Sequence, residues 1–203
     1  MNRVSGKLVV GISGSPRKGG NTDTLLAALL RGAAVAGVRT EALFLRDYRF
    51  SPCIGCEKCR ELKTCGTFRD DMQRLYPVLE QADGLVLGSP THNYNVTAIM
   101  KGFIDRLYPY YDFSADRRKW GSRLGGPGKK ALVFAVCEQP TPENLGVTLP
   151  ALALSFRALG FEIFDEWGVT GFFERATVLQ DPGVMAAAAT RGRKLAEALG
   201  KSV

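Results

Sequence analysis

The sequence KLVVGISGSPRKGGNTDTLLAALL, residues 7–30, decides the fold class of the chain. Its first part, residues 7–13, is a short apolar run of the kind that forms a strand buried on both faces. Residues 14–22 are rich in glycine and polar side chains, and leucines then recur at helical spacing from Leu25 to Leu30. The stretch therefore predicts a strand, a loop and a helix in succession, which is the first unit of an open α/β sheet.

Alternating strands and helices are predicted along the rest of the chain. Because the strands are largely unbroken apolar runs, we expect them to be buried in a parallel sheet. The pattern predicts an α/β protein with an open five-stranded parallel sheet and helices on both of its faces, in a single domain over residues 1–203. The further strands are expected at 40–45, 84–88, 130–136 and 161–169, and the further helices at 70–82, 96–107, 145–159 and 181–199.

Two segments fit this pattern less well. Asp70 is the expected N-cap of the helix at 70–82, although Pro77 lies inside that helix. Residues 108–128 are aromatic and rich in glycine, and they are predicted to be irregular. Because this stretch is too long for an ordinary connection, we expect a functional loop or an interface arm.

The composition is that of an ordinary globular protein. Hydrophobic residues make up 45% and charged residues 23% of the chain, which argues against disorder, collagen and a coiled coil. The longest apolar run, residues 131–137, is far shorter than the roughly 18 residues of a membrane span, and no secretory signal is legible, so we expect a cytoplasmic protein without a membrane partner. The formal net charge of +7 comes without a nucleic-acid-binding motif, which favours a small anionic ligand over nucleic acid.

The loop at residues 14–22, GSPRKGGNT, has the chemistry of a phosphate-binding loop. It is not a Walker A loop, because Gly20-Asn21 stands where lysine and serine or threonine are required, and Gly11-Ile12-Ser13 breaks the dinucleotide fingerprint. The loop leads into a helix N-terminus, where free N–H groups bind anions. An ordinary glycine-rich connection is the alternative interpretation. The side chains suited to an anion are Ser15, Arg17, Asn21 and Thr22.

The loop at residues 89–95, SPTHNYN, follows the third predicted strand. In an open sheet of this kind a ligand lies beyond the carboxyl ends of the first and third strands, so the two loops are expected to converge. One aromatic ring and two asparagine amides suit a flat heterocycle, whereas a polar turn is the alternative interpretation. Because His92 is the only histidine, sites that need two histidine ligands are excluded.

Together, GISGSPRKGGNT at 11–22 and GSPTHNYNVTAIMKGFIDR at 88–106 resemble the NAD(P)H-dependent FMN reductase group of flavodoxin-like proteins. The segment SPCIGCEKCRELKTC at 51–65 is similar to that of the iron–sulfur flavoproteins within this group. The resemblance implies a flavodoxin-like fold, bound FMN and NAD(P)H as co-substrate. It also implies a homodimer or homotetramer with FMN near a subunit interface.

The resemblance further implies which residues contact FMN. The phosphate is expected against the first loop, the isoalloxazine ring against the second, and residues 137–139 under the pyrimidine edge of the ring. At this last position CEQPTPEN departs from the glycine-rich stretch of the family. The catalytic residue is not identified, and His92 and Tyr94 are candidates for supplying a proton or a hydrogen bond. The cofactor-binding residues implied are Ser15, Arg17, Asn21, Thr22, Pro90, Thr91, His92, Asn93, Tyr94, Asn95, Glu138 and Gln139.

Four cysteines lie close together in the loop at 50–66. Their spacing, C-x2-C-x2-C-x5-C, is compatible with a compact four-cysteine cluster. The resemblance to iron–sulfur flavoproteins implies a [4Fe–4S] cluster near FMN. Zinc, free thiols that oxidise on isolation, and a remnant loop packed over the flavin are the alternatives. The candidate metal ligands are Cys53, Cys56, Cys59 and Cys65, whereas Cys137 follows a buried strand and is expected in the core.

Three functions are compatible with these features. The first is an FMN-dependent oxidoreductase that passes reducing equivalents from NAD(P)H to a quinone, flavin, nitro compound or metal acceptor. The second is an electron carrier that receives electrons from a ferredoxin-like partner, whose acidic surface would suit a basic chain. The third is an interaction module without a cofactor, which would leave two convergent polar loops without a purpose. We expect the first.

Overall fold

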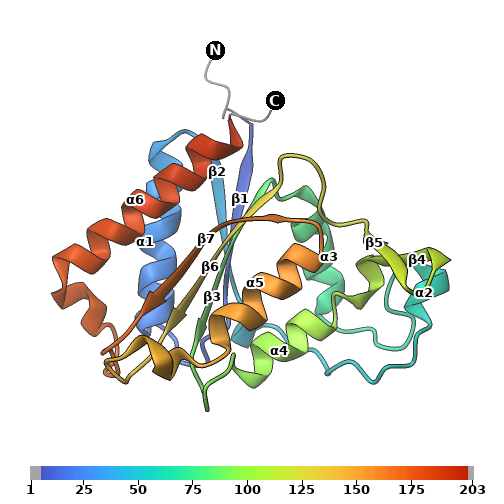
Figure 1. The fold of residues 1–203 in the computed structure, drawn as a ribbon, viewed down its shortest axis with the longest axis horizontal. Helices are drawn as coiled ribbons and strands as arrows, with labels where there is room; N and C mark the ends of the chain where they lie inside the picture. Colours follow the sequence, from blue (N-terminus) through green and yellow to red (C-terminus); the bar gives the residue numbers. More distant parts are fainter. Residues whose placement is uncertain (1–5, 201–203) are drawn as a thin grey trace.

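The computed structural model describes residues 6–200, with the side chains of 114–116 outside that description. Its centre is a parallel sheet of five strands in the order β2-β1-β3-β6-β7 (Figure 1). This order is that of a flavodoxin-like doubly wound sheet, as predicted. The strands are β1 (Leu8–Ser13), β2 (Arg39–Phe44), β3 (Gly84–Pro90), β6 (Lys130–Val136) and β7 (Glu162–Val169).

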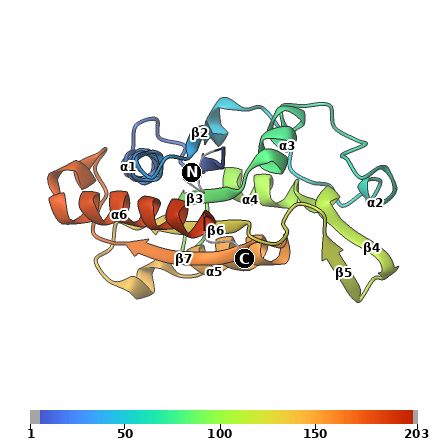
Figure 2. The ribbon, with the colours of Figure 1, turned by 90° about the horizontal axis from the view of Figure 1, so that it is seen from above.

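Helices cover both faces of this sheet (Figure 2). The first and last helices, α1 (Asn21–Val35) and α6 (Pro182–Leu199), pack on one face. The other face carries α3 (Met72–Gln81), α4 (Ala98–Asp105) and α5 (Thr148–Ala158). Both faces are therefore buried, which explains why the central strands are continuous apolar runs. Among the described residues, no helix has both the length and the apolar character that a membrane crossing requires.

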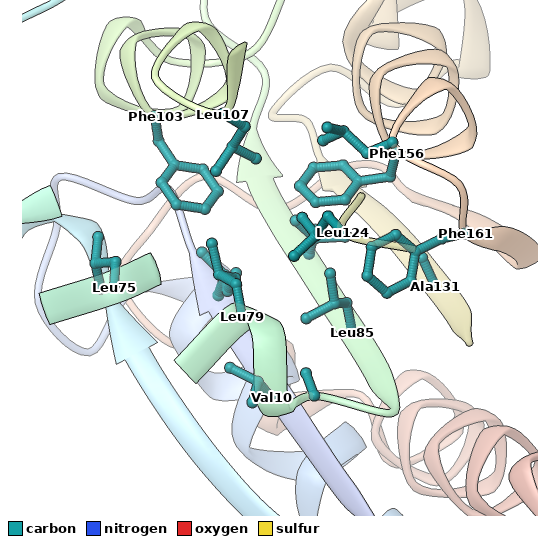
Figure 3. Close-up of a cluster of buried hydrophobic side chains, with 14 of the residues drawn as sticks. Val10, Leu75, Leu79, Leu85, Phe103, Leu107, Leu124, Ala131, Phe156 and Phe161 are labelled. Atoms are coloured by element: carbon teal, nitrogen blue, oxygen red, sulfur yellow. The ribbon is translucent and has the colours of Figure 1, made fainter. Parts of the chain in front are cut away.

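Side chains of each strand divide between two core layers, because successive strand residues point to opposite faces. Val9 packs toward α1 and α6, whereas Val10 packs toward α3, α4 and α5. Figure 3 shows the second layer, in which Leu85 of β3 lies among side chains from the helices. Cys137 is buried at the end of β6, as predicted.

Two glycines allow α1 and α6 to pack with their backbones in close contact. A Cβ atom at Gly192 would lie 1.8 Å from the Leu29 carbonyl oxygen, and one at Gly32 would lie 1.9 Å from the Ala189 carbonyl oxygen. No side chain fits at these distances, so glycine is required at both positions.

The prediction that residues 108–128 are irregular is wrong. A 3-10 turn, η2 (Tyr108–Tyr110), leads into an antiparallel hairpin of β4 (Tyr111–Asp116) and β5 (Lys119–Ser122). The Tyr111 and Trp120 rings, one from each strand, meet edge to face with centroids 5.1 Å apart. The run of charged residues at 116–119 forms a two-residue turn, which the sequence pattern did not indicate. The hairpin lies against the cysteine segment, where Lys63 and Asp112 form an ion pair at 3.2 Å.

Other boundaries move by one to three residues. The helix expected at 70–82 begins at Met72 with Asp71 as its N-cap residue, and the Asp70 carboxylate forms an ion pair with Arg106 at 2.7 and 3.0 Å. Asp70 still accepts a hydrogen bond from the Met72 amide at 3.2 Å, and the helix continues through Pro77. The short elements are η1 (Leu45–Asp47), α2 (Cys59–Leu62), η3 (Pro142–Leu145), which precedes α5, and η4 (Thr177–Gln180).

Candidate functional site

A cavity of about 390 Å³ lies beyond the carboxyl ends of β1, β3 and β6. Its volume is within the range of sites for small molecules and cofactors. The loops after β1 and β3 converge on it, because neighbouring parallel strands end at the same edge of the sheet. The lining residues are Ser15, Pro16, Arg17, Gly20, Asn21, Thr22, Pro90, Thr91, His92, Asn93, Val136, Glu138, Phe172, Phe173 and Arg175.

Most of the residues predicted to bind the cofactor are brought together here. Tyr94, Asn95 and Gln139 do not line the cavity. The remaining nine do, and they come from the loops after β1, β3 and β6, from the last residue of β3 and from the start of α1. Contact between these nine residues and FMN itself stays a prediction. They are Ser15, Arg17, Asn21, Thr22, Pro90, Thr91, His92, Asn93 and Glu138.

A tight turn explains the position of Tyr94. The His92 amide donates to the Asn95 carbonyl oxygen at 2.8 Å, and the Asn95 amide donates back to His92 at 3.1 Å. Asn93 and Tyr94 both have positive φ, at 47° and 62°, which is the geometry of a type I′ turn. Tyr94 is 62% exposed at the tip of this turn, whereas His92 and Asn93 line the cavity.

The loop after β1 is shaped from beneath by Asp23, which sequence reasoning did not identify. Asp23 is buried in the first turn of α1. Its carboxylate accepts hydrogen bonds from the Ser13 hydroxyl at 2.6 Å and from the Gly19 amide at 2.8 Å. Arg46 compensates the buried charge, since its Nη2 lies 2.8 Å from Asp23 Oδ2. The Asp23–Arg46 ion pair and the hydrogen bonds of Asp23 therefore anchor the loop to α1.

Asn21 has a structural partner in addition to its place on the cavity wall. Its amide nitrogen donates to the Glu174 carbonyl oxygen at 2.9 Å, and its oxygen accepts a hydrogen bond from the Val178 amide at 3.2 Å. Arg17 donates to the Phe173 carbonyl oxygen at 3.3 Å. We call residues 171–178, between β7 and α6, the strap. These contacts fix the strap against the loop after β1.

The strap supplies three cavity residues that sequence reasoning missed. Phe172, Phe173 and Arg175 follow β7, whose carboxyl end is at the same edge of the sheet as those of β1, β3 and β6. The available signal was the segment GFFERAT at 171–177, which places two aromatic rings and an arginine directly after the last strand.

The cavity is electrostatically suited to an anion. Two guanidinium groups, from Arg17 and Arg175, and one carboxylate, from Glu138, line it. Asn21 and Thr22 begin α1, whose first-turn N–H groups lie at the positive end of the helix dipole. Two aromatic rings, Phe172 and Phe173, and the Asn93 amide line other parts of the wall. The residues present therefore fit a phosphorylated ligand with a flat ring.

The four clustered cysteines line a second cavity, of about 200 Å³. A hydrogen bond with Thr67, at 3.0 Å, lowers the pKa of the Cys56 thiol, and burial raises that of Cys59. Cys53, Cys56, Cys59 and Cys65 are all free thiols. Within residues 6–200, no three His, Cys, Asp or Glu side chains are grouped so that they could hold a metal ion. The residue types fit a four-thiolate site, but their present spacing does not form one.

The cysteine segment is fixed by a buried ion pair. Arg106 is only 2% exposed, lines the cysteine cavity, and forms a bidentate contact with Asp70. It also donates to the Ser51 carbonyl oxygen at 2.7 Å. Both ends of the segment at 51–70 are therefore held by one guanidinium. Arg106 directly follows α4, a helix of 8 residues, about 12 Å long, and the other end of α4 is capped by Thr97, which bonds Gly14 in the loop after β1.

The strand order and the cavity at the β1 and β3 termini define a flavodoxin-like protein. A solved archaeal flavodoxin superposes with a TM-score of 0.60 at 14% identity, over 95% of this chain and 98% of that one. The chain belongs to the NADPH-dependent FMN reductase family, whose model matches residues 8–133.

Curated relatives carry the name iron–sulfur flavoprotein. One from Archaeoglobus fulgidus is 34% identical over 77% of this chain and 72% of its own length. One from Methanocaldococcus jannaschii is 42% identical over 50% of this chain and 52% of its own length, so that match spans about half of each protein.

Proposed function

We propose that this chain is an oxidoreductase that uses FMN to pass reducing equivalents from NAD(P)H to a small-molecule acceptor, which is a quinone, a flavin, a nitro compound or a metal ion. The observation that carries the proposal is the convergence of the loops after β1 and β3 on one cationic cavity. Membership of the NADPH-dependent FMN reductase family supports it.

FMN, when bound, supplies the hydride and electron chemistry, and the protein supplies binding, orientation and electrostatics. Arg17 and the first-turn N–H groups of α1 bind the phosphate. Residues 90–93 position the ring, and the backbone of their turn is held by the paired His92 and Asn95 amides. His92 lines the cavity, so its imidazole is the candidate for a proton or a hydrogen bond to the substrate.

Anaerobic purification, flavin analysis and NAD(P)H oxidation assays test this function. We expect FMN to bind with one site per chain, and NAD(P)H oxidation to depend on FMN and to accelerate with at least one of the four acceptor classes. A protein that binds no FMN at saturating concentration contradicts the proposal. FMN binding without any NAD(P)H oxidation contradicts the enzymatic part alone.

We propose an electron carrier with a ferredoxin-like partner as the second candidate. The observation that favours it is that Cys53, Cys56, Cys59 and Cys65 all line one cavity, and curated relatives carry the name iron–sulfur flavoprotein. Iron and acid-labile sulfide that disappear in Cys59→Ser, without NAD(P)H turnover, would favour the carrier. Turnover in a protein that takes up no iron would favour the reductase.

We also propose that the chain forms a homodimer or homotetramer in the cytoplasm. It is supported by the family resemblance and by the exposed Tyr94 ring beside the cavity. Light scattering at micromolar concentration tests it, and a monomer would contradict it.

A further inference from the structure

Arg175 brings a second guanidinium group to the cavity, and it comes from the strap rather than from a loop predicted to bind the cofactor. Its side chain is exposed at the cavity wall. Among residues 6–200, no hydrogen bond or ion pair engages this guanidinium. A cation without a protein partner at a cavity wall is free to bind an anionic ligand.

The contact of Arg175 with the loop at 14–22 shows at which end of the cavity its guanidinium lies. A Cβ atom at Gly19 would lie 2.9 Å from Arg175 Nη2, so this guanidinium packs directly on the turn of the loop. Gly19 has φ +66°, which favours glycine independently of the available space. The ring-side residues at 90–93 come from a different strand. Arg175 therefore lies at the anion end of the cavity.

The backbone on both sides of Arg175 is held in place. Asn21 bonds the Glu174 carbonyl oxygen at 2.9 Å and the Val178 amide at 3.2 Å, so it fixes the strap before and after Arg175. Arg17, in contrast, donates to the Phe173 carbonyl oxygen and lies 4.8 Å from the centroid of the Phe173 ring. Arg17 therefore uses one N–H donor on the strap, whereas all the N–H donors of the Arg175 guanidinium remain available to a ligand.

We propose that Arg175 binds the phosphate group of FMN and makes the cavity select the phosphorylated flavin over riboflavin. The proposal rests on the proposed function, since it assumes that the flavin occupies this cavity. A guanidinium presents paired N–H donors that match two phosphate oxygens, and riboflavin lacks those oxygens. A residue of the strap, after the last strand of the sheet, thus determines the preference for FMN over riboflavin.

The test compares FMN and riboflavin affinities for Arg175→Ala, Arg175→Lys and a matched control, measured by quenching of flavin fluorescence. The control is Arg31→Ala, which removes an exposed arginine from α1 away from the cavity wall. We expect Arg175→Ala to weaken FMN binding by about tenfold and riboflavin binding by less than about twofold. Arg175→Lys retains part of the preference, and Arg31→Ala leaves both affinities unchanged.

Three results would overturn the inference while leaving the proposed function intact. The first is unchanged FMN affinity in Arg175→Ala. The second is an equal loss of affinity for both flavins, which would mean that Arg175 shapes the strap without binding the phosphate. The third is unchanged FMN affinity with a raised KM for NADPH, which would assign Arg175 to the dinucleotide. Wild-type protein that binds neither flavin would instead overturn the proposed function.

Discussion

The Thr97 hydroxyl donates a hydrogen bond to the Gly14 carbonyl oxygen at 2.7 Å, across 83 positions of sequence. Thr97 is also the N-cap residue of α4, where its side-chain oxygen accepts a hydrogen bond from the Met100 amide at 3.2 Å. Gly14 begins the loop after β1, and Thr97 ends the loop after β3. One buried side chain therefore holds together the two loops that form the cavity.

Replacing Thr97 with valine removes both hydrogen bonds while preserving the shape of the side chain. We expect the free energy of unfolding to fall by about 2 kcal/mol, since a cap and a buried hydrogen bond are lost together. FMN affinity falls as well, because the two loops are no longer fixed to each other. Urea unfolding and a flavin titration check this. Thr97→Ser should retain most of the stability, and a Thr97→Val variant as stable as wild type would contradict the role.

Removing the Asp23 carboxylate leaves Arg46 without its buried partner and frees the Gly19 amide. We expect Asp23→Ala to lose about 3 kcal/mol of unfolding free energy, as is typical when one member of a buried ion pair is removed. The matched control is Asp47→Ala, because Asp47 is 62% exposed and only 4.0 Å from the other side of Arg46. Equal effects of the two substitutions, in chemical denaturation, would show that the buried ion pair does not organise the loop.

The sheet and one half of the site could be predicted from sequence because both depend on local pattern. Continuous apolar runs identified the central strands, and strand order alone requires the loops after β1 and β3 to meet. The strap could not be predicted, because its contacts depend on long-range packing. Asn21 bonds residues 153 and 157 positions away, and no local pattern encodes such pairs. Its side chain was expected only at a phosphate, yet it also anchors the strap.

The cysteine segment and the hairpin were also only partly predictable from local sequence patterns. The spacing of the cysteines is compatible with a compact cluster, and all four line one cavity, but within residues 6–200 they are not grouped closely enough to hold a metal ion. The β4–β5 hairpin beside them was missed, because the charged turn at 116–119 has neither glycine nor asparagine to mark it. Arg106, which fixes the cysteine segment, lies outside this segment in the sequence. Its role is visible only from its contact with Asp70 in the structure.

The close contact of α1 with α6 makes Gly192 intolerant of any side chain. Gly192→Ala places a methyl group 1.8 Å from the Leu29 carbonyl oxygen, so the helices must separate. We expect a loss of about 2 kcal/mol, despite the higher helix propensity of alanine. Gly183→Ala, in the exposed first turn of α6, is the control, and it should cost much less, because a Cβ atom there meets only the Asp181 carboxylate oxygen, at 3.2 Å. Thermal unfolding that ranks the two variants in the opposite order would refute the packing argument.

The Asp70–Arg106 pair makes part of the stability depend on pH. Burial raises the pKa of Asp70, but hydrogen bonds from Arg106 and the Ser51 amide hold it below its usual value. The ion pair therefore makes its full contribution to folding stability above the unfolded-state pKa of Asp70, about 3.9. This contribution is lost as the pH falls through the lower pKa that Asp70 has in the folded state.

Asp70→Asn should accordingly lose about 2 kcal/mol of unfolding free energy at neutral pH and converge with wild type in acid. Urea unfolding between neutral pH and strong acid measures the difference. Asp105→Asn removes an exposed partner of Lys101 and should cost less than about 0.5 kcal/mol at every pH. A difference between Asp70→Asn and wild type that does not change with pH would rule out the titration of Asp70 as its source.

A crystal structure of the chain grown with saturating FMN tests the location of the flavin without intermediate steps. We expect the phosphate at the loop 14–22, between Arg17 and Arg175, and the isoalloxazine ring against residues 90–93. A cavity that stays empty under these conditions, or FMN bound at a different place on the molecule, would contradict this expectation.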